Sequence, residues 1–419
     1  MNYIKTFMAN MLTIAAFAAF TVSCDNLEDT EKLQVTEVTV SPATLTLTVD
    51  ETQTLTAEAL PAEAEDKTLT WSSSNAAVAT VNAQTGEVTA VAEGEATITA
   101  TSVNGITGSC ALTVTLPAVN VYVAGYETNA SDNYVATLWT NGVAQRLTDG
   151  TNSATARSVY VSGNDVYVAG IEINASGNYV AILWKNGIAQ RLTDGTKDAR
   201  VSSVYVSGND VYVAGEELNA SGMHIAILWK NGVAQRLNES SAEAYSVYVS
   251  GNDVYVAGYE AERAVVWKNG VAQWLTDGTN SVAATSVYVS GNDVYVAGYE
   301  EDESYNTVAI LWKNGAMQQL TDRTSNALAN SVYVSGNDVY VVGYEINASG
   351  EWAAILWKNG VAQRLTDGTG YAGASSVYVL GSDVYVAGEE GDVATLWKNG
   401  VAQRLTDGTT STGGSVFVK

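Results

Sequence analysis

Between residues 119 and 419, short runs of alternating apolar and polar residues recur in a fixed order. Each repeat has four such runs, which we call A to D: Ser-Val-Tyr-Val, Asp-Val-Tyr-Val-Ala-Gly, Val-Ala-Ile-Leu-Trp and Val-Ala-Gln-Arg-Leu. A period of two predicts β-strands, and the Gly, Asn and Asp between runs predict tight turns. A Trp ends run C in seven repeats, at spacings of 38 to 45 residues: Trp139, Trp184, Trp229, Trp267, Trp312, Trp357 and Trp397. Four strands in a repeat of this length predict a seven-bladed β-propeller.

The two ends of the repeat region complement each other. The first repeat starts at Val119 directly with run B, whereas Ser415–Lys419 forms a run A without the other three runs. Placing this C-terminal strand in the first blade completes all seven blades and covers both sheet edges. An open solenoid gives no reason to split a repeat in this way, so the sequence predicts a closed ring.

Residues 34–116 carry a second alternating pattern, rich in Thr and Val. Runs such as Leu45–Val49 and Ala96–Ala100 are separated by turn residues, and Trp71 lies near the middle. About seven short strands around one central Trp predict a small β-sandwich. Pro117 marks the boundary, so we expect an Ig-like domain at 34–116 and the propeller at 117–419.

Two resemblances follow from these residues. Residues 34–116 resemble the group 2 bacterial Ig-like domains through Val40-Ser41-Pro42, Leu45–Leu55, Trp71–Ser74, Ala77–Ala79 and Thr85–Ala96. This resemblance implies an extracellular spacer that presents another domain. The later repeats resemble the seven-bladed propeller repeats of bacterial secreted proteins, as in Gly291–Tyr299. Because such propellers have diverse roles, this second resemblance implies a fold and not an activity.

The first 23 residues have the pattern of an export signal. A short basic start with Lys5 precedes the apolar run Phe7–Val22, which is too short for a comfortable membrane span. Thr21-Val22-Ser23-Cys24 resembles the lipobox of bacterial lipoproteins, which implies acylation of Cys24, with ordinary cleavage as the alternative. Residues 24–33 would then be an acidic tether. They resemble the acidic signals of surface-displayed lipoproteins, so we expect an exported protein anchored to the outer membrane of a Gram-negative bacterium and exposed at its surface.

The composition limits the classes of partner and of catalysis that are expected. The chain has 20 Lys and Arg against 45 Asp and Glu, a net charge of −25, and both predicted domains are acidic. Such a surface repels phosphate backbones and anionic headgroups, so we expect no nucleic acid partner. One His and two Cys leave little scope for His or Cys catalysis, and we expect no cofactor. Cys110 lies in an alternating run and is predicted to be a small buried residue.

Repeat variation predicts where a ligand would bind. The A–B and C–D turns are short and nearly identical between repeats, whereas the B–C and D–A loops differ from blade to blade. Any function that is specific to individual blades is therefore expected on the face that carries these longer loops. Five residues before the run C Trp stand Tyr134, Tyr179, His224 and Trp352, whose flat rings suit contacts with a sugar or a protein. The alternative is that these rings only cover the blade ends.

Acidic residues also recur once per blade, at Glu127 and Asp149 in the first repeat and at equivalent positions in the others. Clustered oxygens attract hard cations, so calcium is a possible ligand. Capping of turns and pairing with the Arg of run D account for the same residues structurally, and we favour this account. We predict no metal site.

The sequence predicts a monomeric, non-catalytic cell-surface lipoprotein that binds a carbohydrate or another surface or host protein through the propeller loops. No pair of carboxylates stands out as a glycosidase pair, and no nucleophile motif accompanies His224, so no catalytic residues are predicted. A polysaccharide-acting enzyme, either a glycoside hydrolase or a lyase, is one alternative. A structural component of an envelope complex is the other.

Overall fold

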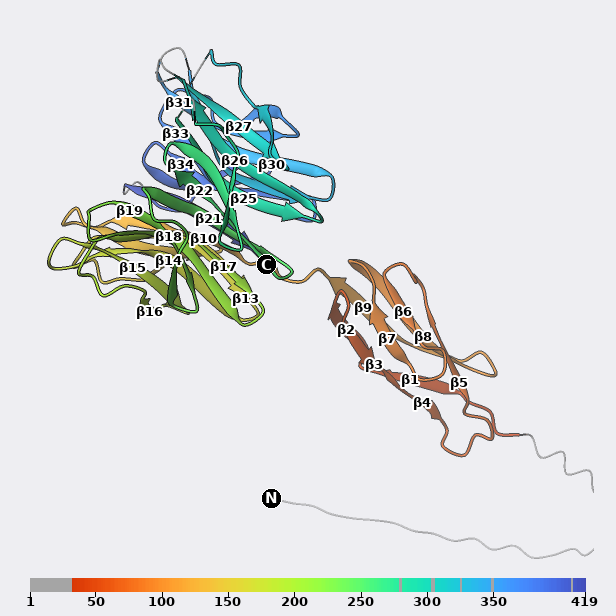
Figure 1. Ribbon diagram of the computed structural model, residues 1–419. Helices are drawn as coiled ribbons and strands as arrows, with labels where there is room; N and C mark the ends of the chain where they lie inside the picture. Colours follow the sequence, from red (N-terminus) through yellow and green to blue (C-terminus); the bar gives the residue numbers. More distant parts are fainter. Residues whose placement is uncertain (1–31, 279–280, 303–305, 325, 348–349, 408–409) are drawn as a thin grey trace, which may run out of the picture. The chain divides into compact units, whose positions relative to one another are not determined.

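The computed structural model describes residues 32–278, 281–302, 306–324, 326–347, 350–407 and 410–419. The chain divides between Ala118 and Val119 into two compact units built from β-strands (Figure 1). Cys24 and the predicted signal peptide lie outside the described residues. The described part of the chain contains no helix with the length and hydropathy needed to cross a bilayer.

The N-terminal unit is a β-sandwich, as predicted. Its described strands are β1 (Glu37–Ser41), β2 (Thr44–Thr48), β3 (Thr52–Thr54), β4 (Thr56–Leu60), β5 (Leu69–Ser73), β6 (Ala79–Val81), β7 (Glu87–Ala90), β8 (Gly94–Ser102) and β9 (Thr107–Thr115). They pair in the orders β2-β9-β8-β5, β3-β7-β6 and β1-β4. Strand β2 runs parallel to β9, and the other pairs are antiparallel.

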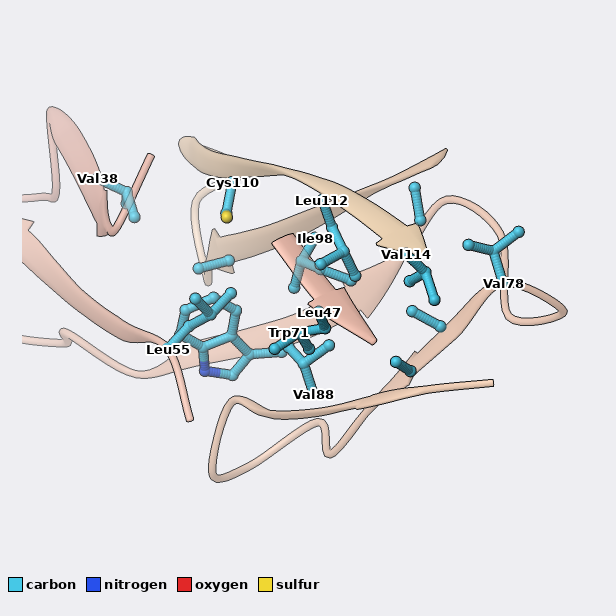
Figure 2. Close-up of a cluster of buried hydrophobic side chains, with 14 of the residues drawn as sticks. Val38, Leu47, Leu55, Trp71, Val78, Val88, Ile98, Cys110, Leu112 and Val114 are labelled. Carbon is cyan, nitrogen blue, oxygen red and sulfur yellow. The ribbon is translucent and has the colours of Figure 1, made fainter. Parts of the chain in front are cut away.

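One hydrophobic core holds this sandwich together. Trp71 packs in it with Leu55, Ile98 and Leu112 (Figure 2). Cys110 is fully buried in the same core, which confirms its predicted place. A Cβ on Gly86 would lie 2.7 Å from the Trp71 indole, so the sandwich needs glycine beside its tryptophan.

The C-terminal unit consists of seven four-stranded antiparallel sheets, one per blade, which confirms the predicted propeller. Blade 1 contains β37 (Ser411–Val418), β10 (Val121–Thr128), β11 (Tyr134–Thr140) and β12 (Val143–Arg146). Blade 2 contains β13 (Ala154–Ser162), β14 (Asp165–Ile173), β15 (Tyr179–Lys185) and β16 (Ile188–Arg191). Blade 3 contains β17 (Ala199–Ser207), β18 (Asp210–Leu218), β19 (His224–Lys230) and β20 (Val233–Arg236). Blade 4 contains β21 (Ala242–Ser250), β22 (Asp253–Glu260), β23 (Arg263–Lys268) and β24 (Val271–Trp274).

The remaining blades repeat this order of strands A to D. Blade 5 contains β25 (Ser281–Ser290), β26 (Asp293–Glu301), β27 (Thr307–Lys313) and β28 (Ala316–Gln319). Blade 6 contains β29 (Ala327–Ser335), β30 (Asp338–Ile346), β31 (Trp352–Lys358) and β32 (Val361–Arg364). Blade 7 contains β33 (Ala372–Leu380), β34 (Asp383–Glu390), β35 (Val393–Lys398) and β36 (Val401–Arg404).

The chain ends close the ring as the sequence predicts. Strand β37 is strand A of blade 1 and pairs antiparallel with β10, with Val418 opposite Val121 and Ser411 opposite Glu127. The first and last strands of the repeat region thus share one sheet, and β10 has a neighbour on both sides. Such closure removes two free sheet edges.

In blades 1, 2, 4 and 5 the strand C tryptophan packs against a glycine of strand B. The seven tryptophans are at most 1 % exposed. In blade 2, strand A has a bulge between Ala156 and Ser158, opposite Gly170. A Cβ on Gly170 would lie 2.1 Å from the Thr155 carbonyl oxygen and 2.8 Å from the Trp184 ring. Only glycine fits at this close approach.

Neighbouring blades are joined by a hydrogen bond that recurs at all seven contacts. The Val204 amide of blade 3 donates to the Ser158 hydroxyl of blade 2, at 3.0 Å. At the point of closure the Val159 amide donates to Ser415 Oγ at 3.3 Å. The other five pairs are Val247–Ser203, Val287–Ser246, Val332–Ser286, Val377–Ser331 and Val416–Ser376. Strand A is the innermost strand, so this bond satisfies an amide that has no neighbouring strand on that side.

Replacing the packed glycine will destabilise the propeller. We expect Gly170→Ala to lower the free energy of unfolding by about 1–3 kcal/mol, because the added methyl group overpacks the Thr155 carbonyl and Trp184. Gly370→Ala is the matched control, because a Cβ there meets nothing within 4 Å. Chemical denaturation measures both variants, and equal stability of the two would contradict the packing argument.

Candidate ligand-binding face of the propeller

The tight turns gather at one end of the blades. In blade 2, residues 162–165 join strands A and B, and residues 185–188 join strands C and D. Gly163, Asn186 and Gly187 have φ of 57°, 52° and 79°. This left-handed conformation explains why Gly and Asn recur in both turns.

A polar staple ties the two turns of a blade together. Lys185 Nζ lies 2.7 Å from Asp165 Oδ2, and Asn186 Nδ2 donates to Asp165 Oδ1 at 2.8 Å. These bonds from Lys185 and Asn186 lower the pKa of the Asp165 carboxyl. Blades 3 to 7 repeat the ion pair as Asp210–Lys230, Asp253–Lys268, Asp293–Lys313, Asp338–Lys358 and Asp383–Lys398. The polar residues that recur at this end of each of these blades therefore stabilise the turns.

The same end of strand A carries a closed ring of aromatic side chains. Consecutive rings lie 4.7 to 4.9 Å apart between centroids, in the order Tyr160, Tyr205, Tyr248, Tyr288, Tyr333, Tyr378 and Phe417. They line a cavity of about 240 Å³. Burial raises the pKa of Tyr160 and Tyr378, so both hydroxyls stay protonated at neutral pH. Because each blade supplies one ring, this feature belongs to the repeated scaffold.

The recurring acids at the opposite end cap turns and form ion pairs. Asp149 Oδ1 accepts a hydrogen bond of 2.9 Å from the Thr151 amide. Asp194, Asp322 and Asp367 each accept the equivalent hydrogen bond from the amide two residues later. Glu127 lies 3.6 Å from the Arg146 guanidinium. These contacts agree with the interpretation that the recurring acids cap turns and form ion pairs. Among the described residues, no group of three or more His, Cys, Asp and Glu could hold a metal ion.

At this loop end the first residues of strand A face the last residues of strand B. Arg200 lies opposite Glu216, Leu328 opposite Tyr344, and Thr412 opposite Tyr126. The aromatic or histidine at the start of strand C extends the same line, because its side chain alternates onto the same face. We call each set of three a radial row. Four rows contain a predicted site residue: Thr412-Tyr126-Tyr134, Thr155-Ile171-Tyr179, Arg200-Glu216-His224 and Leu328-Tyr344-Trp352.

Two predicted site residues pack against an aromatic ring of their own rows, Trp352 stacked and Tyr134 tilted at 46°. Trp352 lies 4.2 Å from Tyr344 between ring centroids at 20°, and 4.9 Å from Tyr371. Tyr134 lies 4.6 Å from Tyr126 and is 43 % exposed. Each forms an aromatic surface on its blade, on blades 6 and 1.

Of the other two predicted residues, Tyr179 lines a charged pocket and His224 contacts Glu216, which lines the same pocket. The Arg200 guanidinium lies 4.5 Å above the Tyr179 ring and 3.3 Å from Glu216 Oε1. His224 Nδ1 lies 3.4 Å from Glu216 Oε2. The pocket beside them has a volume of about 200 Å³ and is lined by Arg157, Tyr179, Arg200, Ser202, Glu216, Glu243, Ala244 and Tyr245. Blades 2, 3 and 4 all contribute, and the sequence did not predict this convergence.

Glu216 is the buried acid of this pocket, with 6 % of its surface exposed. Burial raises the pKa of its carboxyl, and repulsion from Glu243 raises it further, whereas His224 and Arg200 act in the opposite direction. Tyr245 donates a hydrogen bond of 2.7 Å to Glu243. Each acid of the pocket thus has a partner among the described residues.

The pocket residues on strands A and B were not predicted from the sequence. The bulge residue before each Ser-Val-Tyr-Val differs between all blades except two: Arg157, Ser202, Tyr245, Thr285, Asn330, Ser375 and Gly414. The position before the Glu of strand B is Tyr in four blades, but Glu216, Glu389 and Ile171 in the others. These departures from the repeat were visible in the sequence. Their meeting at one pocket depends on the bulge and on inter-blade packing.

A comparison with known protein families supports the type of the first domain. Residues 34–114 match the family described as bacterial Ig-like domain (group 2), so this unit is such a domain. Domains of this kind occur in bacterial surface or exported proteins, and with the propeller they fit a role in binding or at the surface. No curated protein matches the chain.

Three solved structures are similar to the chain. The β-propeller domain of the Trilobed protease from Pyrococcus furiosus is 12% identical, with a TM-score of 0.40, over 66% of this chain and 91% of that one. YjhT is 13% identical, with a TM-score of 0.35, over 58% and 91%. Trypanosoma rangeli sialidase in complex with the inhibitor DANA is 9% identical, with a TM-score of 0.31, over 76% and 82%.

The raised pKa of Glu216 predicts a pH-dependent stability. Because the unfolded carboxyl loses its proton at a lower pH than the folded one, stability falls as pH rises from the ordinary value of 4.5 through the folded pKa. We expect Glu216→Gln to gain stability relative to the parent as pH rises from about 4 to 7. Urea unfolding across this range measures the difference. Glu217→Gln, on the opposite face of the same strand, is the control, and an unchanged difference for Glu216→Gln would contradict the prediction.

Proposed function

We propose that the protein is a non-catalytic surface lipoprotein that binds carbohydrate through the loop end of its propeller. In this proposal Cys24 carries the lipid anchor at the outer membrane, and the Ig-like domain is the spacer. The observation that carries the proposal is the stacked pair of Trp352 and Tyr344 at the loop end of blade 6. Flat aromatic faces beside hydrogen-bonding groups suit the C–H face and the hydroxyls of a sugar ring.

Hydrogen-bonding groups accompany the aromatic rows on the neighbouring blades. Thr412 Oγ1 donates to Glu389 Oε2 at 2.5 Å and lies 3.1 Å from the Tyr126 hydroxyl. The Tyr126 ring in turn packs against Tyr134 at an angle of 46°. This network supports carbohydrate as the ligand class, because a sugar offers several hydroxyls to pair with oxygen acceptors and donors.

Binding is favoured over polysaccharide cleavage by the surroundings of Glu216, one of the two described carboxyls with a raised pKa, the other being Glu345. Glu216 has a raised pKa and a second acid, Glu243, nearby, which is the environment of a general acid. However, Glu216 is nearly inaccessible and is contacted by Arg200 and His224. A general acid must reach the bond that it protonates. Glu216 instead supports the wall of the pocket.

Aromatic substitutions at the loop end will weaken glycan binding. We expect Trp352→Ala and Tyr134→Ala each to reduce affinity about threefold to tenfold, because each removes a stacking surface. A glycan array identifies a bound glycan, and calorimetry with that glycan measures the loss. The same array with added calcium tests whether binding requires the ion.

Trp274→Ala is the matched control, because it removes an exposed indole from strand D, the outermost strand of blade 4. Equal losses in this variant and in Trp352→Ala would place binding away from the radial rows. An array without any bound glycan would contradict carbohydrate as the ligand.

Lipid anchoring at Cys24 is tested separately. We expect the full chain, produced in a Gram-negative host, to incorporate a labelled fatty acid and to enter the membrane fraction. Cys24→Ser will lose both properties, because a serine hydroxyl does not accept the thioether-linked lipid. Cys110→Ala removes the buried thiol and serves as the control. Labelling that persists in Cys24→Ser would overturn the anchor.

A further inference from the structure

Arg157 is one of the two arginines that line the charged pocket. It occupies the bulge of β13, at the wall of the charged pocket. Its side chain is exposed to solvent, while partial desolvation by the neighbouring protein and the nearby Arg200 guanidinium lower its pKa from the ordinary value. No described residue forms a hydrogen bond or an ion pair with this guanidinium. Arginine keeps its charge at neutral pH, so an accessible positive charge without an ion-pair partner among the described residues lies at the wall of the pocket.

The nearby charged groups are already engaged. Arg200 pairs with Glu216, which also contacts His224, and Glu243 accepts the Tyr245 hydroxyl. At the tight-turn end, six lysines pair with aspartates, although acids outnumber bases 45 to 20 in the chain. The exposed Arg157 guanidinium, which has no ion-pair partner among the described residues, can therefore pair with an anionic group from solution.

The pocket leaves room beside Arg157 for an outside group. The bulge residues of the two neighbouring blades are small, Ser202 in blade 3 and Gly414 in blade 1. The volume of about 200 Å³ is below the range of roughly 300–1,000 Å³ that is typical of drug-sized ligands. A single charged group with part of its sugar ring therefore matches the space better than a whole oligosaccharide.

We propose that this pocket binds the carboxylate of an acidic sugar, with Arg157 as its main contact and Arg200 as a second positive charge. The proposal rests on carbohydrate binding by the loop end and names the class of sugar. The planar guanidinium of Arg157 offers parallel N–H donors to both carboxylate oxygens. Tyr179 beneath Arg200 holds that second guanidinium at the pocket wall. The net charge of −25 repels an acidic glycan at long range, so its binding depends on these two local charges.

The test uses the full chain and pairs of probes that differ only in charge. The probes are uronic acid oligosaccharides, such as oligogalacturonate and oligomers of glucuronate, each with its methyl-esterified form. The ester keeps the sugar backbone and removes the negative charge. A sulfated glycan without uronate forms a third arm, which separates recognition of a carboxylate from recognition of any anion. Affinity is measured by calorimetry for each probe.

We expect at least one free uronate oligosaccharide to bind about tenfold or more tightly than its methyl ester. Arg157→Gln should remove this preference, a loss that corresponds to about 1.4 kcal/mol for a tenfold change. Arg157→Lys should retain part of it, because a point charge remains without the paired donors. Arg191→Gln is the matched control, because it removes the same charge from the exposed outer strand of the same blade.

Four outcomes overturn the inference. They are equal binding of acid and ester, an unchanged preference in Arg157→Gln, an equal loss in Arg191→Gln, and tightest binding of the sulfated glycan. In each case carbohydrate binding itself would stand. The failure of every neutral and acidic glycan to bind would instead remove the proposed function and the inference together. Circular dichroism and thermal unfolding of Arg157→Gln confirm that a loss of binding is not a loss of fold.

Discussion

The hydrogen bond between the Ser of one inner strand and the Val amide of the next is the interaction on which the propeller depends. An innermost strand has no neighbour on the axial side, so its amides would face the centre unpaired. Each Ser hydroxyl satisfies one such amide, and the bond from Val159 to Ser415 joins the last strand to the second blade. An unpaired buried amide costs about 1–3 kcal/mol, so every repeat is constrained to keep the Ser-Val pair. The near-identity of the repeats follows from this shared contact.

The bulge beside each of these serines frees the preceding residue from that constraint. In blade 2 the register shifts between Ala156 and Ser158, so Arg157 has no partner of its own on β14. A residue without a cross-strand partner can vary without disturbing the ladder. This is why a nearly uniform segment of the repeat, Ser-Val-Tyr-Val in six of the seven blades, directly follows a variable position. The scaffold thus presents changeable side chains at the loop end while its inner ring stays fixed.

The sequence predicts the architecture well because strands, turns and tryptophans repeat locally. The strand C tryptophans, the split first blade and the variable loop end all appear in the structure as expected. The site is harder to predict, because its residues meet only across strands and blades. Tyr179 and His224 were singled out, but their link through Arg200 and Glu216 depends on a register shifted by the bulge. The ring from Tyr160 to Phe417 was not predicted, because an aromatic residue at the same position of every repeat is typical of core packing.

A symmetric scaffold becomes useful for recognition when its symmetry is broken at one end. On blades 6, 7 and 1 the loop end carries stacked aromatic rings beside Glu389, whereas on blades 2, 3 and 4 it carries Arg157, Arg200 and their paired acids. A ligand with an apolar face and an anionic group can satisfy both halves in one orientation only. A sugar ring that stacks on an aromatic side chain can still rotate, whereas a carboxylate held by a guanidinium has a fixed orientation. The aromatic half would therefore contribute contact area, and the charged half would set the orientation of the ligand. Specificity would then arise from the few positions at which the blades differ, and affinity from the surface that they share.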